Sequence, residues 1–303
     1  MASIIELLSE ATAFLHFKGI EQPKWDGECL LAHVLKCSPL ELHLRCKEVI
    51  SFSDADYFQK LLRRRGKREP LQYILGEVDF FNVKLKVDSR VLIPRHETEY
   101  LVAWLVDDIK ERYLNNKFGN KESVPSLSKL HILDLGTGSG AIGIALGKSF
   151  PESWVTAVDQ SPLALEVARE NGQKNQVKNL QFLASDWYNI FEVHEALQAL
   201  RQERFDIIVS NPPYLSQREW DEAQDEIRRY EPATALIAGD EGFDAIEIIL
   251  QGAPKFLKKN GMIAIETGIL HPQRLREKYK NLFRRTKILQ DLNKFDRFFI
   301  AEL

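Results

Sequence analysis

The chain has 303 residues, a length that suits one large domain or two ordinary ones. Apolar residues make up 44% and charged residues 28%, which is the balance of a soluble globular protein. The net charge of -3 gives no general support for a nucleic-acid-binding or membrane-associated protein, although a local basic patch is compatible with it.

The first residues show no basic segment followed by a long apolar run, so we expect neither a signal peptide nor a transmembrane helix. The three cysteines, Cys29, Cys37 and Cys46, all fall near the start of the chain. Their spacing matches no metal motif, and their odd number fits a reducing compartment. We therefore expect buried free thiols, no metal site and a cytoplasmic protein.

Helical spacing of apolar residues dominates residues 1–75, for which we predict a small helical bundle. One helix is predicted from Ile4 to Leu15 and a second around Cys29 to Val34. A third is predicted to begin near Ser53, a residue type that caps helices well.

A change of pattern follows this bundle. Apolar and polar residues alternate after Asn82, which predicts a β-hairpin within a linker of residues 76–93. The second domain is then predicted to span residues 94–303, with Thr98 capping its first helix. Residues 115–128 are rich in Asn, Lys, Ser and Gly, which is typical of an exposed loop.

Strand-like and helix-like segments alternate through the rest of the chain. The strand-like runs are Lys129–Leu135, Trp154–Val158, Leu180–Leu183, Phe205–Val209, Gly261–Glu266 and Arg297–Ala301. Helical segments such as Leu163–Asn171 and Phe243–Leu257 lie between them. This alternation predicts an α/β domain with a doubly wound, mostly parallel sheet and helices on both faces. The last strand follows another near Thr286–Leu289 and is expected to run antiparallel at the edge.

The loop after the first strand of this region is rich in glycine. Its residues are Gly136, Thr137, Gly138, Ser139 and Gly140, and a helix follows them. Glycines let the backbone turn sharply and let a ligand approach the main chain closely. Taken alone, the loop suits NAD, FAD or S-adenosylmethionine, or an ordinary strand-to-helix turn.

Acidic residues follow the next two strands. Asp159 ends the second strand, where a carboxylate can hydrogen-bond both ribose hydroxyls of an adenosine ligand or can simply cap the next helix. Asp186 and Trp187 follow the third strand, and a carboxylate beside an aromatic ring can hold an adenine. A core tryptophan after a turn is the competing interpretation of Trp187.

A stiff tetrapeptide follows the fourth strand. Its residues are Asn211, Pro212, Pro213 and Tyr214. Consecutive prolines cannot continue a strand, so the backbone must leave the sheet in a fixed shape at the edge where open α/β sheets bind ligands. An amide, free carbonyls and an aromatic ring suit a planar group carrying an NH2, which predicts chemistry on an amide or amino nitrogen.

The order of these motifs resembles the S-adenosylmethionine-dependent methyltransferases of the doubly wound class, in which this tetrapeptide marks amino- or amide-nitrogen methylation. The strings from Arg68 to Gly76 and from Val91 to Glu99 narrow the resemblance to the HemK/PrmC family of protein-(glutamine-N5) methyltransferases. The likeness covers nearly the whole chain. It departs at His96, where the family usually has proline, and at Thr267, where isoleucine is usual.

The resemblance implies a class I, Rossmann-like methyltransferase whose helical N-terminal domain recognises the substrate. S-adenosylmethionine would be the methyl donor, held by the glycine loop, Asp159, Asp186, Trp187 and Asn211, and would become S-adenosylhomocysteine. The target would be the glutamine of the Gly-Gly-Gln motif in peptide chain release factors, methylated in support of translation termination. The tetrapeptide would be the catalytic element. We expect a monomer with no stable nucleic-acid partner and no membrane partner.

Other functions stay open on the sequence alone. An adenine-N6 methyltransferase acting on DNA or RNA would use the same tetrapeptide on a flipped base, although no basic recognition region stands out. A ribosomal-protein glutamine methyltransferase and a non-catalytic, translation-associated binding module also remain. The basic run from Arg63 to Arg68 is typical of a solvated helix end, or alternatively can dock an acidic surface.

Overall fold

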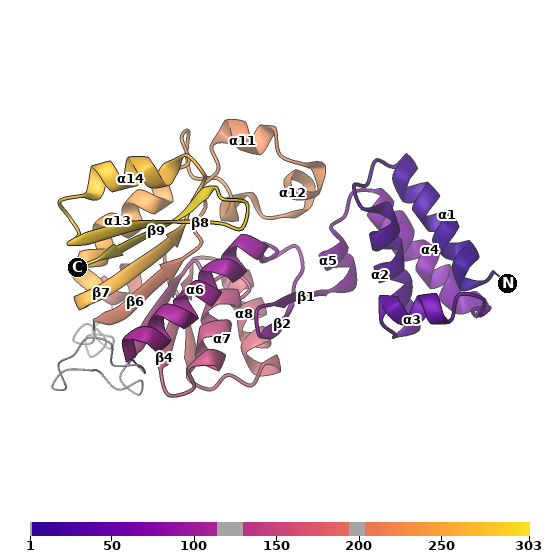
Figure 1. Cartoon of the computed structure of the whole chain (residues 1–303), viewed down its shortest axis with the longest axis horizontal. Coiled ribbons are helices and arrows are strands. Elements are labelled where there is room, and N and C mark those ends of the chain that lie inside the picture. The colour runs from indigo at the N-terminus through magenta and orange to yellow at the C-terminus, as the bar shows by residue number, and fades with distance from the viewer. Residues whose placement is uncertain (1, 114–129, 194–203) are drawn as a thin grey trace. The chain divides into compact units, whose positions relative to one another are not determined.

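The computed structural model describes residues 2–113, 130–193 and 204–303, which form two compact units (Figure 1). The first unit contains the residues up to Glu77 together with Gln224–Tyr230, and the second contains Val78–Ala223 and Glu231–Leu303. The sequence analysis divided the chain into continuous stretches and did not include this second segment of the first unit. The loop predicted at residues 115–128 lies outside the described residues.

The first unit is helical. Its elements are α1 (Ile4–Phe17), α2 (Pro23–Leu35), α3 (Pro39–Leu44), α4 (Phe52–Gly66), α5 (Leu71–Leu75) and α12 (Asp225–Tyr230). The three predicted helices correspond to α1, α2 and α4. Ser51, and not Ser53, caps α4, because the Ser51 hydroxyl accepts the backbone N–H of Asp54 at 3.1 Å. The three cysteines are free, as predicted, but they are half-buried rather than buried.

Basic residues at the end of α4 form ion pairs within the first unit itself. Arg65 is only 8% exposed and donates to Asp26 on α2 at 2.6 Å and to Glu226 on α12 at 3.1 Å. Arg68 donates to the same Glu226 carboxylate at 3.0 Å. A solvated helix end is therefore the wrong interpretation for Arg65. These two arginines fasten α12 to the helical bundle.

The second unit is built on a seven-stranded sheet with the strand order β5-β4-β3-β6-β7-β9-β8. The strands are β3 (His131–Leu135), β4 (Trp154–Asp159), β5 (Leu180–Ala184), β6 (Phe205–Ser210), β7 (Leu257–Glu266), β8 (Arg285–Gln290) and β9 (Asp296–Glu302). In sheet order, the neighbouring strands β5, β4, β3, β6 and β7 all pair in parallel, whereas β9 runs antiparallel to both of its neighbours. The predicted direction of the last strand is confirmed, but its predicted place is wrong. Strand β8 forms the edge, and β9 lies between β7 and β8.

A separate hairpin, β1 (Glu77–Phe80) and β2 (Val83–Lys86), occupies the predicted linker, with its turn next to Asn82. The remaining elements are α6 (His96–Tyr113), α7 (Ala141–Ser149), α8 (Pro162–Lys174), α9 (Asn189–Val193), α11 (Gln217–Asp221), the 3-10 turn η3 (Ala233–Ala235), α13 (Asp244–Phe256) and α14 (His271–Tyr279). No helix in the described part of the chain is both long and apolar enough to cross a bilayer.

Two apolar layers sandwich the large sheet. Along β3, Ile132 packs in one cluster with α6 and α7, and Leu133 packs in the opposite cluster with α13 and α14, because successive strand side chains point to opposite faces (Figure 1). Each buried side chain of this size contributes about 1.5–3 kcal/mol. The doubly wound α/β prediction is confirmed.

The strand order also creates a switch point at β3. The chain continues from β3 to β4 on one side, whereas β6 lies on the other side of β3. In such sheets the loops after the two flanking strands separate and leave a crevice at the carboxyl ends. The crevice brings together the glycine loop, the end of β4 and the tetrapeptide after β6.

Candidate active site

One cavity at the carboxyl ends of β3 to β6 gathers most of the predicted site residues. Those that line it are Gly136, Thr137, Gly138, Ser139, Asp159, Asp186, Trp187, Asn211 and Pro213. Three predicted residues do not line it: Gly140, which is the N-cap of α7, buried Pro212, and Tyr214. The site therefore has the predicted centre, although these three residues do not line the cavity itself.

The sequence analysis missed a second wall of the cavity. It is formed by Arg90, Val91, Leu92, Pro94 and Thr98, and by Pro232, Thr234 and Ala235. The Glu231 carboxylate holds these two segments together, since it accepts the Ile93 backbone N–H at 3.2 Å and the Arg95 guanidinium at 2.6 Å. In the sequence, the string from Val91 to Glu99 indicated only the resemblance to a family. The polar residues beside Pro94 were the signal that could have predicted a wall of the site.

The glycine loop leaves its main chain open to a ligand. Gly138 has a φ of 54°, which favours glycine, and a Cβ added there would meet nothing within 4 Å. Gly136 has a φ of 70°, which also favours glycine, and the Trp187 ring lies in ordinary van der Waals contact, 3.4 Å from the position that a Cβ would take. The loop can therefore take a group laid directly on its backbone.

Asp159 fixes this loop from the neighbouring strand. Its carboxylate accepts the Gly138 N–H and the Ser161 N–H, both at 2.8 Å. Burial raises the pKa of this carboxyl, and the two backbone N–H groups partly offset that rise. Ser161 is itself the N-cap of α8, with its hydroxyl accepting the Ala164 N–H. Since each carboxylate oxygen can accept two hydrogen bonds, Asp159 keeps capacity for a ligand's hydroxyl groups.

Trp187 occupies an unusual backbone conformation at the cavity. Its φ of 48° lies in the left-handed region, which costs about 1–3 kcal/mol for a bulky residue. Ser185 stabilises this turn, because its hydroxyl donates to the Trp187 carbonyl at 2.8 Å and accepts the Ile190 N–H at 3.0 Å. The half-buried ring lines the cavity and also packs against the core cluster around α13. Trp187 therefore lines the cavity, as its interpretation as a ligand contact predicts, and also packs against the core, as the competing interpretation predicts.

A chain of hydrogen bonds connects the tetrapeptide to a buried carboxylate. The Asn211 amide nitrogen donates to the Thr98 hydroxyl at 2.9 Å, and that hydroxyl donates to Glu266 at 2.6 Å. The Tyr214 hydroxyl donates to the other Glu266 oxygen at 3.2 Å. Burial raises the pKa of Glu266 to about 7. The predicted capping role of Thr98 is wrong. Helix α6 begins at His96, and the Thr98 hydroxyl donates to Glu266 on β7 instead.

The backbone of the tetrapeptide is held from outside the sheet. The N–H groups of Tyr214 and Leu215 both donate to the Leu236 carbonyl, at 3.1 and 2.8 Å. The Ala238 N–H returns a bond to the Leu215 carbonyl at 2.9 Å. Before the prolines, the Ser210 hydroxyl donates to the Leu135 carbonyl at 2.7 Å. These bonds give the segment the fixed shape that its two prolines predict.

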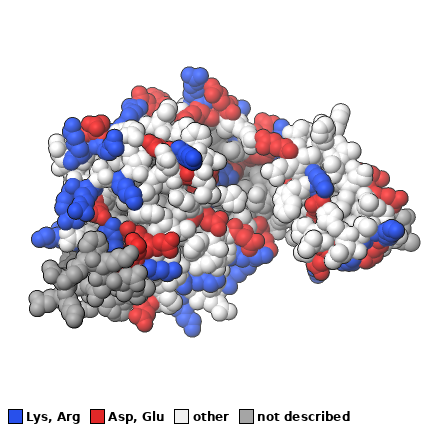
Figure 2. Space-filling model, in the orientation of Figure 1, with Lys and Arg blue, Asp and Glu red and all other residues white. Residues whose placement is uncertain are grey.

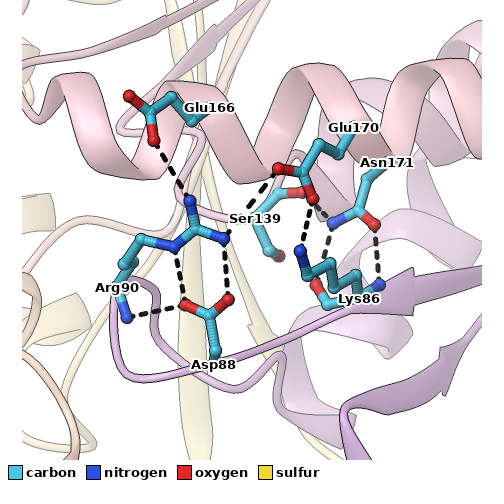
Figure 3. Close-up of polar contacts among 7 residues, drawn as sticks. All are labelled: Lys86, Asp88, Arg90, Ser139, Glu166, Glu170 and Asn171. Atoms are coloured by element: carbon cyan, nitrogen blue, oxygen red, sulfur yellow. Dashed lines mark hydrogen bonds and ion pairs between the residues drawn. The ribbon is translucent and has the colours of Figure 1, made fainter.

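A polar staple joins the hairpin to the glycine loop (Figure 3). The fully buried Asn171 on α8 accepts the Lys86 N–H at 2.6 Å and donates to the Lys86 and Ser139 carbonyls at 3.0 and 2.9 Å. Beside it, Arg90 makes a two-pronged contact with Asp88 and reaches Glu166 at 3.1 Å. The hairpin end, one cavity wall and the glycine loop are thereby fixed to the same helix.

Comparisons with known proteins agree with this geometry. A methyltransferase-domain family model matches residues 126–297, and a PrmC N-terminal domain model matches residues 6–76. The chain is 37% identical to the release factor glutamine methyltransferase of Chlorobaculum tepidum over 300 residues, which cover 97% of this chain and 95% of that protein. This chain belongs to the release factor glutamine methyltransferase family.

Other members of the release factor glutamine methyltransferase family are similarly close. The protein of Rhodopirellula baltica is 37% identical over 265 residues, covering 87% of this chain and 83% of its own length. A solved structure, the catalytic domain of hMettl16 in complex with an RNA hairpin, has a TM-score of 0.52 and 14% identity, covering 80% of this chain and 81% of that chain. That likeness shows a shared methyltransferase fold. The family membership makes this chain a methyltransferase enzyme.

Proposed function

We propose that this enzyme transfers a methyl group from S-adenosylmethionine to the side-chain amide nitrogen (N5) of the glutamine in the Gly-Gly-Gln motif of peptide chain release factors. The names of the 37% identical relatives support the substrate. The observation that carries the chemistry is the orientation of Asn211: its nitrogen is engaged by Thr98, so its oxygen is available to an N–H group at the cavity.

The cavity fits the proposed donor. Bound S-adenosylmethionine supplies an activated methyl group on a positively charged sulfur. The open main chain at Gly138 would accept the ligand, the Asp159 carboxylate would accept ribose hydroxyls, and Asp186 and Trp187 would hold the adenine. Gly136 contributes the left-handed backbone turn beside the Trp187 ring. This set of acidic, aromatic and glycine residues around one cavity supports the proposal of an adenosine ligand there.

The tetrapeptide would hold the target amide. A carboxamide nitrogen is a poor nucleophile, because its lone pair is delocalised into the carbonyl group. The Asn211 side-chain oxygen and the Pro212 carbonyl would accept its two N–H bonds, fix its direction and favour positive charge on nitrogen as the methyl is transferred. Pro213 keeps the loop stiff, and Tyr214 would pack against the planar amide and exclude water. As the new N–C bond forms, the bond from the methyl group to sulfur would break and leave S-adenosylhomocysteine. The displaced nitrogen proton would then pass to solvent.

We propose that the partner is a peptide chain release factor. The enzyme would act as a monomer in the cytoplasm, and its helical unit would recognise the substrate protein. Figure 2 shows basic and acidic side chains interspersed over the described residues of the visible face. A nucleic-acid substrate usually meets a continuous basic surface. The interspersed charges of this one face therefore give the adenine-N6 alternative no support.

The test is Asn211→Ala, assayed with purified release factor and labelled methyl donor. We expect methyl transfer to fall by about 100-fold or more, because one pre-oriented acceptor is lost at the reacting nitrogen. Donor binding by calorimetry should persist, since the glycine loop is untouched. Asn175→Ala, a substitution at the C-cap of α8, serves as the matched control and should keep the wild-type rate.

Two outcomes would contradict the proposal. One is an Asn211→Ala enzyme that methylates the release factor at the wild-type rate. The other is a wild-type enzyme that labels DNA or RNA, in a parallel reaction, in preference to the release factor. Mass spectrometry of the Gly-Gly-Gln peptide locates the added methyl group.

A further inference from the structure

The hydrogen bonds that connect Asn211 to Glu266 all donate toward Glu266: Asn211 donates to Thr98, and Thr98 donates to Glu266. Glu266 lies at the end of β7 and is 1% exposed, and both of its oxygens accept: one from the Thr98 hydroxyl at 2.6 Å, the other from the Tyr214 hydroxyl at 3.2 Å. An ionised carboxylate has no proton to donate. Thr98 must therefore direct its single hydroxyl proton toward Glu266.

The direction of the Thr98 hydroxyl proton determines the orientation of the Asn211 side-chain amide. Since the Thr98 proton is committed to Glu266, its oxygen is left as an acceptor for Asn211. The Asn211 amide satisfies it with its nitrogen, at 2.9 Å. The amide oxygen then points away from Thr98. An asparagine free to turn over would offer its NH2 group half of the time, and that group repels another NH2.

We propose that Glu266 and Thr98 are positioning residues that hold the Asn211 amide with its oxygen toward the substrate nitrogen. The inference rests on the proposed function, because only a substrate with an NH2 group needs that polarity. Glu266 acts through Thr98 on Asn211 and also anchors the Tyr214 hydroxyl. One buried carboxylate thus orders both polar side chains of the tetrapeptide.

The surroundings of Glu266 make this arrangement sensitive to pH. The groups facing it are Thr98 and Glu97 from α6, Tyr214 from the tetrapeptide loop, and Arg297 from β9. Burial raises its pKa to about 7, Glu97 adds to the rise, and Arg297 opposes it. Once protonated, Glu266 can donate to Thr98. The chain of bonds then reverses, and Thr98 presents its proton to the Asn211 oxygen.

The first test compares Thr98→Val with Thr98→Ser. Valine keeps the shape of threonine but removes the hydroxyl, so kcat for release factor methylation should fall roughly 10- to 100-fold with the donor affinity unchanged. Serine restores the hydroxyl and should recover most of the lost rate. Thr286→Val is the matched control, because Thr286 on the edge strand β8 does not line the cavity and should leave the rate unchanged.

The second test is the pH profile of Glu266→Gln. The wild-type rate should fall as the pH is lowered through about 7, because the neutral acid no longer fixes the direction of the bonds. Glutamine is neutral at every pH, so the variant should show a low rate at high pH and no acid limb near 7. A merely structural Glu266 would lower the rate while leaving the limb in place.

The two proposals fail in different ways. If the wild-type enzyme does not methylate the release factor, the proposed function fails. If it does, and Thr98→Val matches Thr98→Ser in rate or Glu266→Gln keeps the acid limb, the positioning role is wrong. Donor binding to each variant, measured by calorimetry, confirms that the cavity is folded.

Discussion

Asp159 shows how a single side chain serves the protein and the proposed ligand at once. Its two oxygens already accept the Gly138 and Ser161 N–H groups. Asp159→Asn replaces one of these acceptors by an NH2 donor, which faces a backbone N–H and removes the negative charge. Hydrogen bonds to charged groups contribute about 1.5–3 kcal/mol, so we expect the donor Kd to rise by about tenfold or more.

Calorimetric titration with the donor measures this change at Asp159. Asp79→Asn on the hairpin is the control, since its side chain is 84% exposed and lies outside the cavity. An Asp159→Asn enzyme that binds the donor as tightly as the wild type would rule out this carboxylate as a donor contact.

Sequence patterns predicted the residues at the strand ends but not their supports. Asp159 and Asn211 were found because each follows an apolar run at a place where α/β sheets bind ligands. Thr98 was misassigned as a cap and Glu266 was missed. The bond between Thr98 and Glu266 spans 168 residues, and no local pattern reports which distant strand end will lie beside a given helix.

At the scale of elements, α8 and its C-cap residue make two versions of the same contact with β2. Asn171 and Asn175 each bond both the N–H and the carbonyl of a β2 residue, Lys86 and Lys84 respectively. Asn171 is fully buried, whereas the Asn175 contacts are exposed. We expect Asn171→Ala to lower the free energy of unfolding by about 1–3 kcal/mol, because it leaves buried backbone groups unpaired.

Urea denaturation measures the free energy of unfolding of the Asn171→Ala and Asn175→Ala variants. Asn175→Ala should cost less, since water can replace an exposed hydrogen bond. Equal losses for the two variants would show that burial is not what makes the Asn171 staple matter. Asn171→Ala should also weaken donor binding, because its nitrogen holds the Ser139 carbonyl of the glycine loop.

Long periodic segments were predictable, and short ones were not. The strands of the large sheet, the hairpin and helices such as α8 follow from apolar spacing over a full repeat. The helices α3, α5 and α12 have five or six residues, too few for a periodic signal. The place of β9 inside the sheet was also out of reach, because strand order depends on which faces pack and not on local sequence.

For the molecule as a whole, buried carboxyls predict how stability depends on pH. Asp134 and Glu266 both have a pKa raised by burial to about 7, so their folded forms bind a proton more tightly than the unfolded chain does. The stability that this gives is present at low pH and is lost as the pH rises through 7. Buried His271, whose pKa is lowered, acts in the opposite sense as the pH falls.

Comparing the wild type with Glu266→Gln isolates the contribution of one carboxyl. Scanning calorimetry should show the wild-type Tm rising relative to the variant as the pH is lowered from about 8 to about 6. A Tm difference that stays constant across this range would mean that Glu266 is already neutral, or already ionised, throughout.

The excursion of the chain into α12 has a consequence for synthesis on the ribosome. The first unit gains its α12 segment only after Glu226 can pair with Arg65 and Arg68, and Glu226 is made after strands β3 to β6. Domains generally fold from the N-terminus as they emerge. Here the first part of the chain to emerge is among the last to be completed. While most of the parallel sheet is translated, Arg65 of the nascent bundle has Asp26 as its carboxylate partner, and Glu226 joins it later.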